Sequence, residues 1–222
     1  MKIEKQSISN RVLEYLRKQI ILGQYQKGDH LVEAALSKEL GVSRGPIREA
    51  IAKLEAENLV EKHSNGRTVV KRFDIIDIQN LYDSRILLET HALTQIDPEV
   101  LKKNKDVFYL FVGQMNKSYH LKQRDIESDL AFHSYLVKLT DNNTLIQLWT
   151  SLKEVFRTLI DITSEVTESK QQEIIDQHMR IVEGLIAGDL EDAQKRLREH
   201  LQDACHYCCE GKKLNMGRDE YV

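Results

Sequence analysis

Apolar positions in the first part of the chain recur at helical spacing and are separated by turn residues. A first helix carries an inner stripe of apolar side chains, made by Leu13, Leu16 and Ile20. A short helix over about 32–40 ends at Gly41, because glycine readily adopts the left-handed conformation that closes a helix. Ser43 is placed to cap a third helix, with Pro46 in its first turn, where the missing N–H costs little. The pattern predicts three short helices with a tight turn between the second and the third.

Beyond the third helix the pattern changes twice. β-prone runs flank Asn65-Gly66, a dipeptide typical of a tight hairpin turn. After Phe73 the strand signals disappear, and apolar residues recur at helical spacing to about residue 209. We therefore predict a mainly α protein, with an N-terminal winged helix-turn-helix domain over residues 1–73 and an all-helical antiparallel bundle over residues 74–215. The polar residues 216–222 are predicted to form a frayed tail.

The composition of the 222 residues supports folded domains. Hydrophobic residues make up 41% and charged residues 30%, with only 2 prolines and 10 glycines, which excludes a linker-rich or disordered protein. No apolar run approaches the roughly 18–20 residues that a membrane span needs. The first residues also lack the apolar stretch of a signal peptide. We expect a cytoplasmic protein without a membrane partner.

The net charge of −3 hides an asymmetry between the two predicted domains. Residues 1–73 hold 14 Lys and Arg against 9 Asp and Glu, a net of +5. Residues 74–222 hold 18 against 26, a net of −8. A basic domain joined to an acidic one indicates that the two domains meet different partners.

Three cysteines crowd together near the end of the chain, at Cys205, Cys208 and Cys209. Their odd number and their crowding are not typical of a disulfide framework. On a helix the three share one face, so small buried side chains are the simplest interpretation. A redox or metal-binding role is the alternative.

The basic domain carries candidate DNA contacts at the start of its third helix and in its hairpin. The second helix of a helix-turn-helix pair enters the major groove with its N-terminal residues at the base edges. Arg44 and Arg48 lie four apart on one face, and an arginine can grip guanine or a phosphate with two hydrogen bonds. The alternative is that both are ordinary solvated charges. The candidate DNA-binding residues are Ser43, Arg44, Gly45, Arg48, His63, Asn65, Gly66 and Arg67.

The run from Glu33 to Ile51 resembles the winged helix of GntR-type bacterial transcription regulators. The resemblance rests on the core Gly-Val-Ser-Arg-x-Pro-x-Arg-Glu-Ala, which begins at Gly41. It implies that the chain binds double-stranded DNA, and that the third-helix residues named above and the wing make the contacts. One departure is Ala34, at a position where members often carry a basic residue.

Four candidate metal ligands lie in the acidic domain. Asp129 and His133 are four apart, so both can point at one ion. His178 and His200 are equally distant from a turn at Gly188-Asp189, about 16 Å along each helix at a rise of about 1.5 Å per residue. The two histidines therefore lie level if the helices fold back at that turn. Three imidazoles and one carboxylate suit a divalent metal ion, with zinc expected and nickel or manganese as alternatives.

Other interpretations of these residues remain open. A lone histidine in a helix is usually a packed or surface residue. A second, sulfur-rich set would spread around one helix and could not face a single ion; its members are His200, Cys205, His206, Cys208 and Cys209.

Arg85 and Glu89 lie four apart on the apolar stripe of a helix predicted over residues 76–95. One interpretation is an ion pair that reaches the surface. The other is a partly buried arginine ready for an anionic ligand, since a buried arginine is costly unless something pairs with it. Arg85 is therefore the candidate effector-binding residue.

The acidic domain resembles the FCD effector domain of the FadR subfamily. The matching stretches are Tyr82 to Glu89, Asp129-x-x-Phe132-His133, His178, Gly188-Asp189 and His200-Leu201. In members with this full set, the resemblance implies that the four residues hold a divalent metal inside an all-helical bundle. Open coordination positions then accept a small carboxylate, which an arginine like Arg85 helps to anchor. FadR itself lacks the metal set, so the full set argues against a long acyl-CoA effector.

The sequence thus predicts a ligand-responsive bacterial transcription regulator, and the resemblance favours a repressor. We expect a homodimer whose winged helices bind a short inverted repeat, with a small organic acid as effector. A metal sensor, in which the ion itself is the signal, is the first alternative. A metal-dependent hydrolase is a remote one, because no glutamate in a recognisable motif offers a general base. We therefore do not expect an enzyme.

Overall fold

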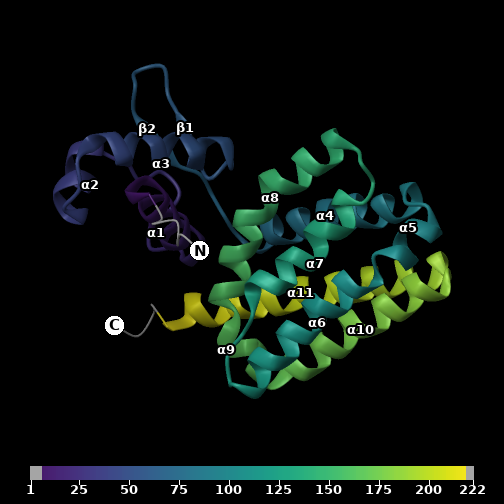
Figure 1. Cartoon of the computed structure of the whole chain (residues 1–222). Helices are drawn as coiled ribbons and strands as arrows, with labels where there is room; N and C mark the ends of the chain where they lie inside the picture. The colour runs from purple at the N-terminus through teal and green to yellow at the C-terminus, as the bar shows by residue number, and fades with distance from the viewer. Residues whose placement is uncertain (1–6, 219–222) are drawn as a thin grey trace. The chain divides into compact units, whose positions relative to one another are not determined.

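The computed structural model describes residues 7–218, apart from the side chains of 164, 165 and 215–218, and Figure 1 shows its helices and strands. Contacts divide the chain into two compact units. The first extends to Ile76 and includes the end of the last helix from Leu214, and the second extends from Asp77 to Lys213. In the described part of the chain, no helix is both long enough and apolar enough to cross a membrane.

The first unit is a winged helix-turn-helix, as the sequence predicts. Its elements are α1 (Ile8–Leu22), α2 (Glu33–Leu40), α3 (Arg44–Ala56), β1 (Val60–Lys62) and β2 (Thr68–Val70). The backbone of Gly41 has φ 65°, a left-handed conformation that ends α2 and makes the tight turn into α3. Helix α1 packs against α3, and Leu16, Ile47 and Leu54 are fully buried in their shared core.

A buried ion pair joins α1 to the end of α3. Arg17 on α1 is almost fully buried and donates two hydrogen bonds to the carboxylate of Glu57, the residue that follows α3. The N···O distances are 2.7 and 2.6 Å. Two parallel bonds specify geometry as well as adding energy, so the pair sets the position of α3 against α1.

The wing is an antiparallel hairpin in which Val60 pairs with Val70 and Lys62 with Thr68. Its turn contains Gly66 with φ 80°, as the Asn65-Gly66 pair predicts. The Asn65 side chain accepts a hydrogen bond of 3.0 Å from the Arg67 N–H, which closes the turn.

The second unit is an all-helical bundle, which confirms the predicted fold class. Its helices are α4 (Ile75–Gln95), α5 (Pro98–Lys103), α6 (Lys105–His120), α7 (Ile126–Lys138), α8 (Asn143–Ile162), α9 (Ser164–Thr167), a 3-10 turn (Glu168–Lys170), α10 (Gln171–Ala187) and α11 (Leu190–Arg218). Helix α6 packs against α7 and α10, and α7 packs against α8. Short polar caps begin several helices; Asp125, for example, accepts from the Ser128 N–H at the start of α7.

The predicted tail begins inside the last helix. Helix α11 continues to Arg218, and residues 219–222 lie outside the described part. Just before this stretch, Gly211 and Lys212 are buried, which composition does not reveal. A Cβ added at Gly211 would lie 2.6 Å from Thr163 Cγ2, so only glycine allows this close approach.

Candidate metal centre and DNA-contact surface

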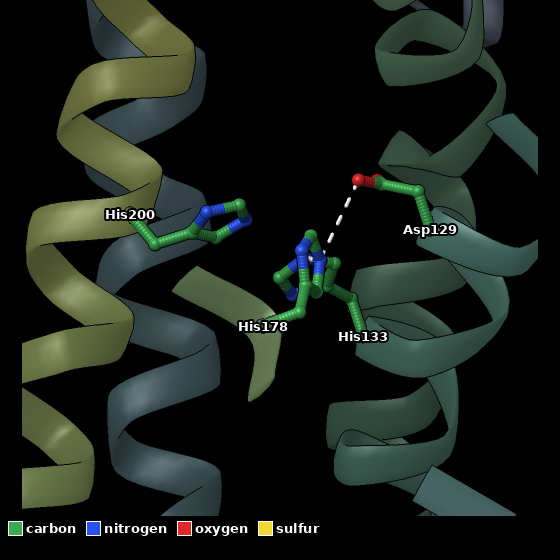
Figure 2. A group of neighbouring side chains, drawn as sticks. All are labelled: Asp129, His133, His178 and His200. Atoms are coloured by element: carbon green, nitrogen blue, oxygen red, sulfur yellow. Dashed lines mark hydrogen bonds and ion pairs between the residues drawn. The ribbon is translucent and has the colours of Figure 1, made fainter. Parts of the chain in front are cut away.

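Helices α7, α10 and α11 bring the four predicted metal ligands together (Figure 2). Asp129 and His133 lie one turn apart on α7, while His178 and His200 face each other from α10 and α11. Gly188, with φ 76°, ends α10 and allows α11 to fold back, which places the His178 and His200 ring centroids 4.3 Å apart. One donor atom from each of the four residues lies within 4.8 Å of the others.

Two of the three imidazoles are oriented by hydrogen bonds from their Nδ1 atoms to acceptor oxygens. His133 Nδ1 lies 2.5 Å from Glu89 Oε2, and His178 Nδ1 lies 2.8 Å from the Ile174 carbonyl oxygen. Because an ionised carboxylate and a carbonyl oxygen only accept, each Nδ1 carries the proton and donates it. In the neutral ring, Nε2 is then left with its lone pair.

The third imidazole is oriented in the same way. His200 Nδ1 lies 2.9 Å from Gln177 Oε1, and Gln177 Nε2 donates to Asp203 at 2.7 Å. The Asp203 carboxylate fixes which end of the amide faces His200, because a carboxylate accepts only from the NH₂ group. His200 therefore also donates from Nδ1 and presents Nε2 as an acceptor.

The arrangement of acceptor atoms fits a cation. His133 Nε2 and His178 Nε2 lie 3.3 Å apart, and His178 Nε2 lies 3.5 Å from Asp129 Oδ2. These atoms repel one another when each presents lone pairs, and a positive ion between them removes the repulsion. A metal with bonds of about 2.1 Å needs donors about 3–4 Å apart, close to the spacing found here. Donor types, tautomers and spacing all suit a divalent transition metal.

Burial keeps His178 and His200 in the form that binds metal. His178 is fully buried, and burial lowers its pKa to about 4. Burial also lowers the pKa of His200 well below its usual value. Both rings are therefore neutral at pH 7, as metal ligands must be.

Arg85 is buried rather than snorkelling, because only 1% of it is exposed. Its Nε donates to Glu89 Oε1 at 2.6 Å, so the interpretation as a surface pair is wrong. Its Nη2 is buried and has no hydrogen-bond partner among the described residues. An orphaned guanidinium nitrogen is costly, and an anionic ligand would satisfy it.

Glu89 links this arginine to the metal set. One oxygen accepts from Arg85 and from Trp149 Nε1, at 2.6 and 2.9 Å, and the other accepts from His133. Burial alone raises the pKa of Glu89, but His133 and Arg85 outweigh it and lower the pKa to about 2. The carboxylate is therefore ionised and orients both His133 and Arg85.

A pocket opens beside the metal set. It is lined by Arg85, Asp129 and His200, together with Arg124 and residues of α8 to α11. Its empty space is about 400 Å³ including the open mouth, and the free room inside is about 20 Å³, enough for about one water molecule. The pocket thus joins the orphaned arginine to two of the candidate metal ligands.

Cys208 and Cys209 are buried, as expected for small packed side chains, whereas Cys205 is half-buried. Cys208 is buried and its sulfur lies 3.3 Å from the Tyr82 hydroxyl. Burial raises the pKa of Cys205 to about 12 and that of Cys208 to about 11. Both thiols stay protonated at neutral pH, which disfavours metal binding and redox chemistry.

All eight candidate DNA contacts are exposed in the first unit. Four lie at the start of α3 and four in the wing, whereas Ile47 and Ala50 on the same helix are buried. Ser43 precedes α3 without a side-chain capping bond, so its hydroxyl is not used inside the helix. The assignment of these residues to DNA contact stays a prediction.

Arg48 has a partner that the sequence did not suggest. Its Nε and Nη2 donate to the Glu33 carboxylate at 3.1 and 3.0 Å, although the arginine side chain is 70% exposed. Such an exposed pair is worth only about 0–1 kcal/mol. A base or phosphate contact of larger energy can therefore displace it.

The sequence does not indicate the roles that Glu89, Gln177 and Arg124 have around the candidate metal site. Glu89 was seen only as the partner of Arg85, and neither Gln177 nor Arg124 was singled out. Adjacency to His178 is a weak signal for Gln177. The chain offers no comparable signal for Arg124, a loop residue before α7.

Comparison with known proteins adds family matches to this geometry. Residues 8–70 match the model for bacterial regulatory proteins of the gntR family. Residues 80–203 match the FCD domain. The two matches together span both compact units.

Individual relatives align with nearly the whole length of this chain. The gluconate operon transcriptional repressor of Bacillus subtilis is 27% identical over 208 residues, which cover 90% of this chain and 85% of the relative. The Uxu operon regulator of Haemophilus influenzae is 26% identical over 209 residues, covering 87% and 79%. A solved structure of Lar, which controls the agr system of Listeria monocytogenes, superposes with TM-score 0.67 at 21% identity, covering 92% of this chain and 98% of that one. The structural likeness shows the fold.

Proposed function

Because the chain belongs to the GntR family of bacterial transcription regulators, with an FCD domain, we propose that it is a repressor controlled by a small carboxylate at a divalent metal site. The family establishes a DNA-binding regulator rather than an enzyme, which removes the hydrolase alternative. We propose that it works in the cytoplasm. The identity of the ion and the effector class are proposals that rest on the site geometry.

The observation that carries the metal proposal is the convergence of three imidazoles, each with its Nδ1 proton engaged and its Nε2 toward the others. We assign Asp129, His133, His178 and His200 as the ligands. Zinc is the expected ion, with nickel or manganese as alternatives. A bound ion supplies Lewis acidity and further coordination positions for a carboxylate oxygen.

Arg85 gives the site its preference for an anion. Its Nη2 has no hydrogen-bond partner among the described residues, and Arg85 lines the pocket together with Asp129 and His200. Glu89 holds the guanidinium in place, so Nη2 can donate to a carboxylate without losing that ion pair. Arg85 is the proposed effector anchor.

The pocket also suggests how occupancy changes the domain. The room inside holds about one water molecule, so we expect an acid to shift side chains that line the pocket, which come from α4 and from α7 to α11. We propose that two subunits pair, that their winged helices bind the half-sites of an inverted repeat, and that this displacement favours one arrangement of the dimer.

DNA recognition is proposed to use Ser43, Arg44, Gly45 and Arg48 from α3, and His63, Asn65, Gly66 and Arg67 from the wing. Replacing Arg48 by alanine is expected to weaken operator binding by about 1–3 kcal/mol, because a bidentate base contact is lost. Fluorescence anisotropy with a duplex selected for binding to this protein measures the change.

The matched control for Arg48 is Arg11→Ala, which removes an exposed arginine on α1 outside the proposed contact set. It should change the affinity far less. Equal effects of the two substitutions would mean that Arg48 contributes only general positive charge, and unchanged binding by Arg48→Ala would remove it from the interface.

A metal sensor remains the alternative, favoured by one observation: four protein donors alone can complete a tetrahedral zinc site. The two functions differ in which ligand changes the affinity of the protein for its operator DNA. If affinity follows zinc concentration without any organic acid, the sensor is correct. If the ion stays bound and only a carboxylate changes affinity, the effector proposal is correct.

A further inference from the structure

A second arginine lies at the pocket. Arg124, in the loop between α6 and α7, is half-buried and lines the pocket together with Arg85 and Asp129. Its Nη1 donates to the Ile160 carbonyl at 3.2 Å and also bonds the Thr167 hydroxyl. These two bonds hold the guanidinium beside the pocket, and they use one of its three nitrogens.

The charges around the pocket do not balance with a singly charged ligand. Arg85, Arg124 and Asp129 are the charged residues among those lining it. Arg85 is already paired with Glu89, and an imidazole that binds a metal ion does so as a neutral ring. A divalent ion beside Asp129 leaves one positive charge, and Arg124 adds another. A ligand with two negative charges would neutralise both, and uncompensated charge in a partly dehydrated site is costly.

Both positive centres belong to one pocket, which Arg85, Arg124 and Asp129 line together. One anionic group at the metal set would meet Arg85, whose Nη2 lacks a partner among the described residues. A second group, separated by a few atoms, would meet the remaining N–H groups of Arg124. A guanidinium binds a carboxylate with two parallel hydrogen bonds, which suits a carboxylate better than a hydroxyl.

We propose that the effector is a small dicarboxylate, and that Arg124 determines this specificity by binding its second carboxylate. The inference rests on the proposed function, since the first carboxylate is the one assigned to the metal and Arg85. It also separates this chain from a regulator of singly charged acids. In the absence of such a ligand role, Arg124 would only tie the loop before α7 to α8 and α9.

Isothermal titration calorimetry of the zinc-loaded 222-residue chain tests the proposal. The probes are unbranched dicarboxylates of three to six carbons, each paired with its monoamide, which has the same size and one negative charge fewer. We expect at least one diacid to bind about tenfold more tightly than its monoamide. In Arg124→Gln that preference should fall below about threefold with little change in monoamide affinity. Arg124→Lys should keep only part of it, because the charge remains but the two parallel hydrogen bonds are lost.

The alternatives give different results. Equal affinities of diacid and monoamide at every length would overturn the dicarboxylate inference, while zinc-dependent binding of the monoamides would leave the proposed function standing. A loss of affinity by the same factor for both probes in Arg124→Gln would show a structural role and overturn the assignment of Arg124. If no acid binds with or without zinc, both the inference and the proposed function are wrong.

Discussion

Replacing Glu89 by glutamine is expected to destabilise the helical domain by about 3–5 kcal/mol, the usual range for removing one partner of a buried ion pair. Glu89 is fully buried and is the acceptor for Arg85, His133 and Trp149. A neutral amide leaves the Arg85 charge buried without compensation, and its NH₂ group cannot accept any of these bonds. Urea unfolding of the metal-free protein, followed by fluorescence, measures the change. Trp149 is the only tryptophan, so the signal reports on this domain.

Glu99→Gln is the matched control for that measurement. Glu99 forms an i,i+3 pair with Lys102, and its side chain is 78% exposed. The same chemical change there should alter the free energy of unfolding by less than about 1 kcal/mol. If the two variants lose similar stability, Glu89 does not compensate Arg85 and the proposed architecture of the site is incorrect. Glu89→Gln should also lower metal affinity about 10–100-fold, because it no longer orients His133.

The second large effect is expected from His178→Ala. At a zinc concentration about 100 times its dissociation constant, binding stabilises the folded protein by about 2.7 kcal/mol. For a chain of this size, that raises the melting temperature by roughly 5–10 °C. The alanine variant removes one of the four donors, so it should lose most of this zinc-dependent shift. Differential scanning calorimetry with and without zinc, for each protein against its own metal-free form, separates this effect from the cavity left by the imidazole.

His206→Ala is the control for the histidine substitution. His206 is exposed on α11, and it belongs to the sulfur-rich set considered as an alternative. That variant should keep the full zinc-dependent shift. A shift lost in His206→Ala and retained in His178→Ala would instead place the metal among the cysteines.

Local signals predicted much of this structure. Gly41, the Asn65-Gly66 turn and the helical stripes define the winged helix-turn-helix, because each depends on backbone conformation that a few neighbouring residues determine. The helical rise also predicted that His178 and His200 lie level across the Gly188 turn. Level placement says nothing about rotation around the helix axis, however. Packing of α7, α10 and α11 determines that the imidazoles also face one another.

Contacts between distant segments could not be predicted in the same way. The spacing of Arg85 and Glu89 indicates a pair, but the contact of Glu89 with His133 on α7 depends on how α4 packs there. Arg124 gains its place from bonds to Ile160 and Thr167, which are distant in the chain. The close approach of α11 to Thr163 depends on the missing side chain of Gly211. In each case the contact joins residues distant in the chain, and the sequence pattern does not reveal such contacts.

Native mass spectrometry of the protein purified without added metal decides whether this regulator holds a metal ion, because it reports metal content and subunit number together. We expect a dimer with one divalent ion per subunit, or uptake of one ion per subunit when zinc, nickel or manganese is added. His178→Ala should show a clear loss of that ion. A wild-type chain that carries no ion and takes up none of the three metals would mean that the four residues are not a metal site.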